Sequence, residues 1–198
     1  LIRSVLLQAG FVSFLFFGAE LGDVTLAANQ VLLQFVYLAS YAMDGFVFAA
    51  ESLVGQAMGA KAVAQLRRGA SVTAVWAFGS AIVMAAGFWI AGPFVIDVMA
   101  KDPAVQQAAR LYLPHMALAT LLGALAWMLD GVFIGATRTK DMRNMMILSF
   151  LGYCGLVLLL LPSFGNHGLW MAMNGFFILR GVSLALRYPA LERVAAAP

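Results

Sequence analysis

The sequence VTLAANQVLLQFVYLASYAM, residues 24–43, contains 20 consecutive residues without a charge. About 20 mainly apolar residues are needed for an α-helix to cross a bilayer, so this stretch predicts a membrane-spanning helix. Polar and aromatic side chains recur through it and just beyond it at steps of four and three. We call this set the polar stripe, and it consists of Gln30, Gln34, Tyr37, Tyr41, Asp44, Phe48, Glu51 and Gly55. These steps place all eight residues on one face of a helix.

Two interpretations of the polar stripe stay open. Ionisable residues in membrane spans nearly always face a bundle interior or a water-filled cavity. The stripe with its two carboxylates therefore indicates a polar path through a membrane protein. The alternative is a seam of hydrogen bonds between helices, since polar side chains also hold membrane helices together.

The composition of the whole chain indicates a membrane protein. Of its 198 residues, 63% are hydrophobic and 11% are charged, whereas soluble domains carry about 25% charged residues. The net charge of +3 does not indicate a nucleic-acid partner, because the basic residues form short clusters between apolar runs. Cys154 is the single cysteine, and His115 and His167 are isolated in the sequence. We therefore expect no metal site and no cofactor, and a structural role for each histidine.

Apolar segments predict an all-α, polytopic membrane protein that forms one unit over residues 1–198. The last uncharged run, residues 144–179, is too long for one crossing, and Pro162 with the Gly-rich residues 165–168 divides it. A membrane β-barrel would need alternating patterns, and these runs are continuous. The predicted spans are approximately 2–20, 25–56, 69–99, 105–137, 142–161 and 169–191.

The distribution of basic residues predicts the orientation in the membrane. With six spans, both termini and two loops share one side. That side carries Arg3, Lys61, Arg67, Arg68, Arg138, Lys140, Arg143, Arg187 and Arg193, and the other carries Lys101 and Arg110. Because Lys and Arg concentrate on the cytoplasmic side, we expect both termini in the cytoplasm and the protein in the inner membrane. Residues 59–69 are expected to form a short amphipathic helix on that surface.

Two spans share a local sequence around an aspartate. Met-Asp-Gly-Phe at 43–46 resembles Leu-Asp-Gly-Val at 129–132, and each aspartate is followed by a glycine that permits close helix approach. We expect Asp44 and Asp130 to be functional, as intramembrane acids usually are. Alternatively, Asp130 is a buried, protonated acid on a packed helix face. Arg180 lies within the last span, where it either pairs with one of these aspartates or extends toward the surface.

Short motifs follow one another along nearly the whole chain. They are LGDVTLAANQ at 21–30, DGF at 44–46, GQA at 55–57 with Gly59, DGVFIGATR at 130–138, DMRN at 141–144, GNHGLW at 165–170 and RYP at 187–189. In this order they resemble the multidrug and toxic compound extrusion (MATE) transporters, in particular their DinF-like branch. That family has twelve helices in two six-helix lobes, and this chain resembles the C-terminal lobe.

The resemblance implies a function. MATE transporters export organic cations and other toxic compounds in exchange for protons or sodium, by alternating access between their lobes. The chain would supply half of the central cavity, and its partners would be an N-terminal lobe, the bilayer, a small organic cation and the coupling ion. Sodium-coupled relatives carry a glutamate in the body of the first helix of this lobe, where this chain has Gln8, and Asp130 is displaced from their second acid. Proton coupling is therefore favoured, and in DinF-like members its aspartate is expected in the N-terminal lobe.

The predicted site for substrate or cations combines the polar stripe with the two aspartates. It consists of Asp44, Asp130, Gln34, Tyr37, Tyr41 and Glu51, with Arg180 as a candidate charge partner. Three other functions stay open: a flippase for lipid-linked oligosaccharides, an intramembrane aspartyl protease and a membrane scaffold. A flippase should have a more cationic cavity. The Gly-x-Gly-Asp motif of the protease class is absent.

Overall fold

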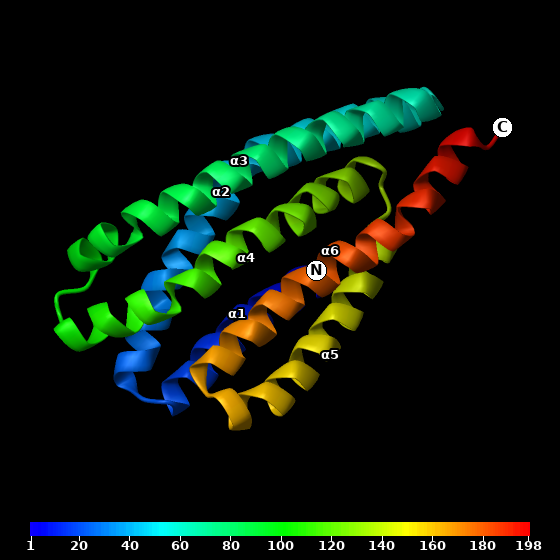
Figure 1. Ribbon diagram of the computed structural model, residues 1–198. Coiled ribbons are helices and arrows are strands. Elements are labelled where there is room, and N and C mark those ends of the chain that lie inside the picture. Colours follow the sequence, from blue (N-terminus) through cyan, green and yellow to red (C-terminus); the bar gives the residue numbers. More distant parts are fainter.

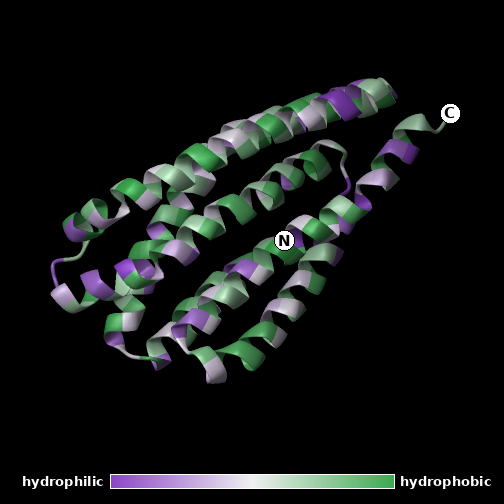
Figure 2. Ribbon diagram, in the orientation of Figure 1, coloured by the Kyte–Doolittle hydropathy of each residue, from purple (hydrophilic) through white to green (hydrophobic).

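The computed structural model describes residues 1–198 and consists of six long α-helices without strands (Figure 1). The helices are α1 (Ile2–Glu20), α2 (Asp23–Gly59), α3 (Val63–Met99), α4 (Pro103–Gly135), α5 (Thr139–Phe164) and α6 (Asn166–Ala196). Each is long and apolar enough to cross a membrane. Figure 2 shows mainly hydrophobic helices, with hydrophilic residues at their ends and at a few positions within them. The predicted all-α membrane fold with six helices is confirmed.

Short connections reverse the chain between neighbouring helices. Gly22, before α2, has a φ of 126°, and Gly165, between α5 and α6, has a φ of 61°. Residues with a side chain rarely adopt such positive φ values, so glycine suits both turns. At the start of α4, Asp102 accepts a hydrogen bond from the backbone N–H of Ala104 at 2.9 Å, and Pro103 occupies the first helical position.

The expectation of a separate surface helix over residues 59–69 is wrong. The chain turns at Lys61, whose φ is 52°, and α3 then runs without interruption from Val63 to Met99. Gly69 does not end a helix here, because it lies against Leu53 of α2, where a Cβ atom would come within 3.2 Å of the leucine Cβ. The glycine thus serves close packing of α3 on α2.

The central helices of the bundle are α4 and α6, whose apolar spans are mostly buried, whereas only a small share of the spans of α1, α3 and α5 is buried. Side chains such as Trp170 and Phe176 fill the core. Large apolar residues such as Trp76 and Ile90 of α3 point outward. An apolar outer surface of this kind suits contact with lipid chains. The centre of α4 therefore lies at the heart of the unit.

Glycines bring the backbones of α2 and α4 together. A Cβ atom added to Gly131 would lie 2.5 Å from the carbonyl oxygen of Val47, and one added to Gly135 would collide with the carbonyl oxygen of Glu51. The four-residue spacing of these glycines is that of small-residue helix contacts in membranes. Gly45, in contrast, has no atom within 4 Å of its Cβ position. The backbones of α2 and α4 thus approach each other closely at Asp130-Gly131 and not at Asp44-Gly45.

Replacing Gly131 with alanine should destabilise the protein. The added methyl group meets backbone rather than a flexible side chain, so the helices must separate, at a cost of about 1–3 kcal/mol. Thermal unfolding of the full-length protein in detergent measures the effect. Gly45→Ala is the matched control, because it gains helix propensity without crowding. Equal melting temperatures for the two variants would contradict the proposed packing.

Candidate functional site

The polar stripe lies along a face of α2 that the other five helices leave largely open. Gln30 and Gln34 are exposed, and the side chains of Tyr41 and Phe48 are 71% and 65% exposed. Asp44 is partly buried and takes part in no hydrogen bond or ion pair within the chain. Buried residues such as Leu32 and Ala39 lie on the other side of α2, whereas the end of the stripe at Glu51 and Gly55 lies close to Gly135 of α4. Most of the stripe is therefore not a sealed seam within these six helices.

A cavity of about 190 Å³ lies among four helices beside the middle of the stripe. Its lining residues come from α1 (Arg3, Leu7, Phe11), α2 (Val36, Tyr37, Ser40, Asp44, Val47), α4 (Trp127, Asp130, Ile134) and α6 (Arg180). Four of them are charged, two of each sign. The rest are mainly apolar or aromatic. We call it the central cavity.

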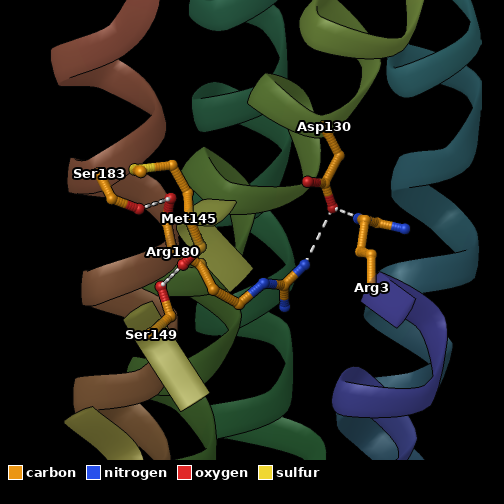
Figure 3. Close-up of polar contacts among 6 residues, drawn as sticks. All are labelled: Arg3, Asp130, Met145, Ser149, Arg180 and Ser183. Atoms are coloured by element: carbon orange, nitrogen blue, oxygen red, sulfur yellow. Dashed lines mark hydrogen bonds and ion pairs between the residues drawn. The ribbon is translucent and has the colours of Figure 1, made fainter. Parts of the chain in front are cut away.

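Asp130 is shared by two arginines in the wall of the central cavity (Figure 3). Its Oδ2 accepts a hydrogen bond from Nη2 of Arg180 at 2.9 Å and a second from Nη2 of Arg3. The side chain of Arg180 is 2% exposed and that of Asp130 is 9% exposed. The Arg180 guanidinium also lies over the rings of Phe176 and Phe177, at 5.7 and 5.9 Å from their centroids, where aromatic faces stabilise a cation.

This cluster decides between alternatives that the sequence left open. Arg180 pairs with Asp130, not with Asp44, and it does not extend toward the surface. Asp130 is not isolated on a packed helix face, because two guanidinium groups donate hydrogen bonds to its carboxylate. Arg3 was missed as a site residue. Its position at the end of a span suggested only a surface charge, and no local pattern reveals that its side chain meets α4.

Two further hollows follow the stripe along α2. One of about 470 Å³ adjoins Gln30, Gln34 and Tyr37 together with the α3–α4 connection at Lys101. The other, of about 510 Å³, adjoins Phe48, Glu51 and Gly55 together with the end of α4 at Thr137. Tyr37 lines both the first hollow and the central cavity. The structure therefore places each stripe residue named as a site candidate, except Tyr41, beside one of three hollows.

His115 and His167 form a pair, although they are isolated in the sequence. Nε2 of His115 lies 3.0 Å from Nδ1 of His167, and the ring of Tyr112 packs edge-on against His167. The pair joins α4 to α6 across a separation of 52 residues. No group of three His, Cys, Asp or Glu side chains is arranged to hold a metal ion.

A buried hydrogen-bond network fixes the start of α2. Asn29 and Asn166 exchange two hydrogen bonds of 2.9 Å, and the indole N–H of Trp170 donates to Asn29 at 3.0 Å. The side chain of Asn29 is also packed against Gly18 of α1, where a Cβ atom would lie 2.7 Å from its amide nitrogen. The network orients α2 so that the neighbouring Gln30 faces outward.

Six long apolar helices, four of which line a cavity with paired charges, define a multi-pass membrane protein. Residues 1–161 match the model of the MatE family, and the chain belongs to this family of MATE transporters. It is 38% identical to DNA damage-inducible protein F of Escherichia coli over 191 residues, which are 93% of this chain and 40% of that protein. It is 28% identical over 182 residues to the probable multidrug resistance protein NorM of Pseudomonas aeruginosa, covering 85% of this chain and 36% of that protein.

Solved structures share the fold. The Vibrio cholerae MATE transporter VcmN in its bent form matches with a TM-score of 0.87 and 17% identity, over 98% of this chain and 44% of that one. The eukaryotic MATE transporter AtDTX14 matches with a TM-score of 0.85 and 18% identity, over 96% of this chain and 45% of that one. The chain thus spans less than half the length of these relatives. The resemblance to MATE transporters and their DinF-like branch is confirmed.

Neutralising Asp130 should destabilise the protein more than neutralising Asp44. Asp130→Asn leaves two guanidinium groups without a carboxylate, and breaking a buried ion pair from one side costs about 3–5 kcal/mol. Asp44→Asn removes a carboxylate that has no partner in this chain. Thermal unfolding of the two full-length variants in detergent makes the comparison. A larger loss for Asp44→Asn would show that the cluster around Asp130 is not the stabilising one.

Proposed function

We propose that the chain is the C-terminal lobe of a secondary active antiporter that exports organic cations by alternating access against an N-terminal lobe. One observation carries this proposal: the polar stripe lies on an open face of α2, with the unpaired carboxylate of Asp44 lining the central cavity. An open polar face within membrane-spanning helices requires a cover of protein or water. A second lobe would supply the protein cover, and a water-filled cavity between the two lobes would supply the water.

The residues along the stripe suit a cationic substrate. Aromatic faces attract cations, and Tyr37 and Tyr41 lie one helical turn apart on the open face. Asp44 supplies the negative charge, Gln34 supplies hydrogen bonds, and Glu51 lies beside the hollow toward the cytoplasmic end as a gate or funnel. Protonation of Asp44 removes its charge and weakens the hold on a cation. A ligand shifts inward-facing and outward-facing states only through its different affinity for each.

Asp130 has a different part in this proposal. Two arginines neutralise it, so it contributes to the cavity wall by holding Arg3 and Arg180 in place. This arrangement also supports proton over sodium coupling. A sodium ion at Asp130 would be repelled by two guanidinium groups within ion-pair distance. The body of α1 carries Gln8 and no acid before Glu20 at its end.

Other functions fit the site less well. A lipid-linked oligosaccharide flippase gains one observation, because Arg3 joins Arg180 in the central cavity. The two arginines are matched there by two aspartates, however, so the cavity has no large positive charge. An aspartyl protease needs two carboxylates that share a proton, whereas Asp130 accepts from two arginines and has no hydrogen bond with Asp44.

We place the lobe in the inner membrane, and the basic residues support an orientation with both of its ends in the cytoplasm. Eight of the nine basic residues on the side of the termini lie at the α2–α3 and α4–α5 connections or at the end of α6, and Arg3 is the ninth. Lys101 and Arg110 lie toward the opposite side. This imbalance follows the positive-inside rule.

Asp44→Asn in the full-length protein should lower efflux of a cationic dye such as ethidium about tenfold, because a charge-assisted contact to the substrate is lost. The rate is measured in everted membrane vesicles with an imposed pH gradient. Asp23→Asn is the matched control, since Asp23 is an exposed acid at the start of the same helix and lines none of the three hollows. Unchanged efflux in Asp44→Asn removes this carboxylate from the mechanism.

The coupling ion is tested in the same vesicles. We expect dye transport to proceed in sodium-free buffer with a pH gradient and to stop when a protonophore removes that gradient. The physical reason is that the two arginines beside Asp130 would repel a sodium ion there, as argued above. Transport that requires a sodium gradient and survives the protonophore would refute proton coupling.

A further inference from the structure

The central cavity contains more hydrogen-bond donors than its own acceptors use. The ion cluster of Arg3, Asp130 and Arg180 has two positive charges and one negative charge. Within it, Nε and Nη1 of Arg180 and Nε of Arg3 are buried and have no hydrogen-bond partner. Buried polar groups in folded proteins are nearly always satisfied. Three unsatisfied guanidinium nitrogens around one cluster therefore point to an acceptor that the six helices do not provide.

Asp44 does not supply this acceptor in the structure. It lines the same cavity, yet it forms no ion pair with either arginine. The cavity as a whole carries two charges of each sign, yet the free guanidinium nitrogens of the cluster have no acceptor. A buried donor without an acceptor is costly, so a ligand that supplies one is favoured.

The other lining residues of the central cavity indicate which further chemical groups a ligand with such an acceptor should have. Leu7 and Phe11 of α1, Trp127 of α4 and Val36 of α2 make most of the lining apolar or aromatic. The volume of about 190 Å³ corresponds to about six water molecules at ~30 Å³ each. A carboxylate on a short apolar body is of comparable size.

We propose that Arg3 and Arg180 form a subsite for the carboxylate of an amphipathic substrate, so that the transporter also accepts molecules with a carboxylate on an apolar body. The planar guanidinium group matches a carboxylate in geometry. Asp130 fixes both arginines in place, and the apolar walls receive the rest of the molecule. This inference rests on the proposed function, because it assigns a substrate class to the cavity of the same transporter.

The test compares two probes that differ only in charge. 4-Phenylbutyrate and its neutral amide, 4-phenylbutyramide, are titrated into the detergent-purified full-length protein at neutral pH, and binding is measured by calorimetry. We expect the carboxylate to bind about tenfold more tightly than the amide, as a charge-assisted contact predicts. Equal affinities overturn the subsite.

Variants of Arg3 locate the contact. Arg3 is the more accessible arginine, with a side chain 25% exposed, and Arg3→Gln leaves the pair of Arg180 with Asp130 intact. It should remove most of the preference for the carboxylate, whereas Arg3→Lys, which keeps the charge but loses the planar fork, should restore part of it. Arg68→Gln, at an exposed basic residue outside the cavity, is the matched control. A preference unchanged in Arg3→Gln, or lost equally in Arg68→Gln, contradicts the proposal.

Efflux of the cationic dye in vesicles separates this inference from the proposed function. Dye efflux without preferential carboxylate binding refutes the subsite and leaves the antiporter in place. Preferential carboxylate binding that depends on Arg3, without dye efflux, supports the subsite and refutes export of organic cations.

Discussion

The shared contact of Asp130 with Arg3 and Arg180 constrains the whole unit, because it joins three helices in a region where an unpaired charge is costly. Arg3 lies on α1, Asp130 on α4 and Arg180 on α6. The guanidinium group of Arg180 needs the carboxylate most, since its side chain is 2% exposed and has little access to water. The cluster therefore fixes α1 and α6 against the C-terminal part of α4. The glycines that follow Asp130 along α4 hold α2 at the same level, so the central cavity forms where the four helices meet.

The fold was largely predictable from the sequence, because a bilayer sets the length of an apolar helix and periodicity sets its faces. The uncharged run at 144–179 divides at Gly165, the residue whose positive φ the turn requires. The expectation of a separate helix over residues 59–69 was wrong for a physical reason. Gly69 and the basic residues before it resemble a break, but packing against Leu53 favours one continuous helix. Tertiary contact overrode the local signal.

The candidate site residues that share one face of α2 were predictable from the sequence. The contacts between side chains of different helices were not. The polar stripe follows from the repeat of α2 alone, and the structure places most of it on an open face. Arg3 beside Asp130, and His115 beside His167, bring together residues 127 and 52 positions apart. No periodicity links such positions. Only the packing of α1, α4 and α6 determines which side chains meet.

The two Asp-Gly pairs show how environment separates residues with the same local sequence. Gly131 lies against the backbone of α2 and Asp130 is held by two cations, whereas Gly45 faces open space and Asp44, beside the central cavity, has no ion partner. A transporter that alternates between two states needs a charge whose partner can change. Asp130 is bound on both sides by arginines, so a change there would break the contacts that hold three helices together. Under the proposed function, Asp44 suits this part, because it lines the cavity and no contact that holds the lobe together depends on its carboxylate.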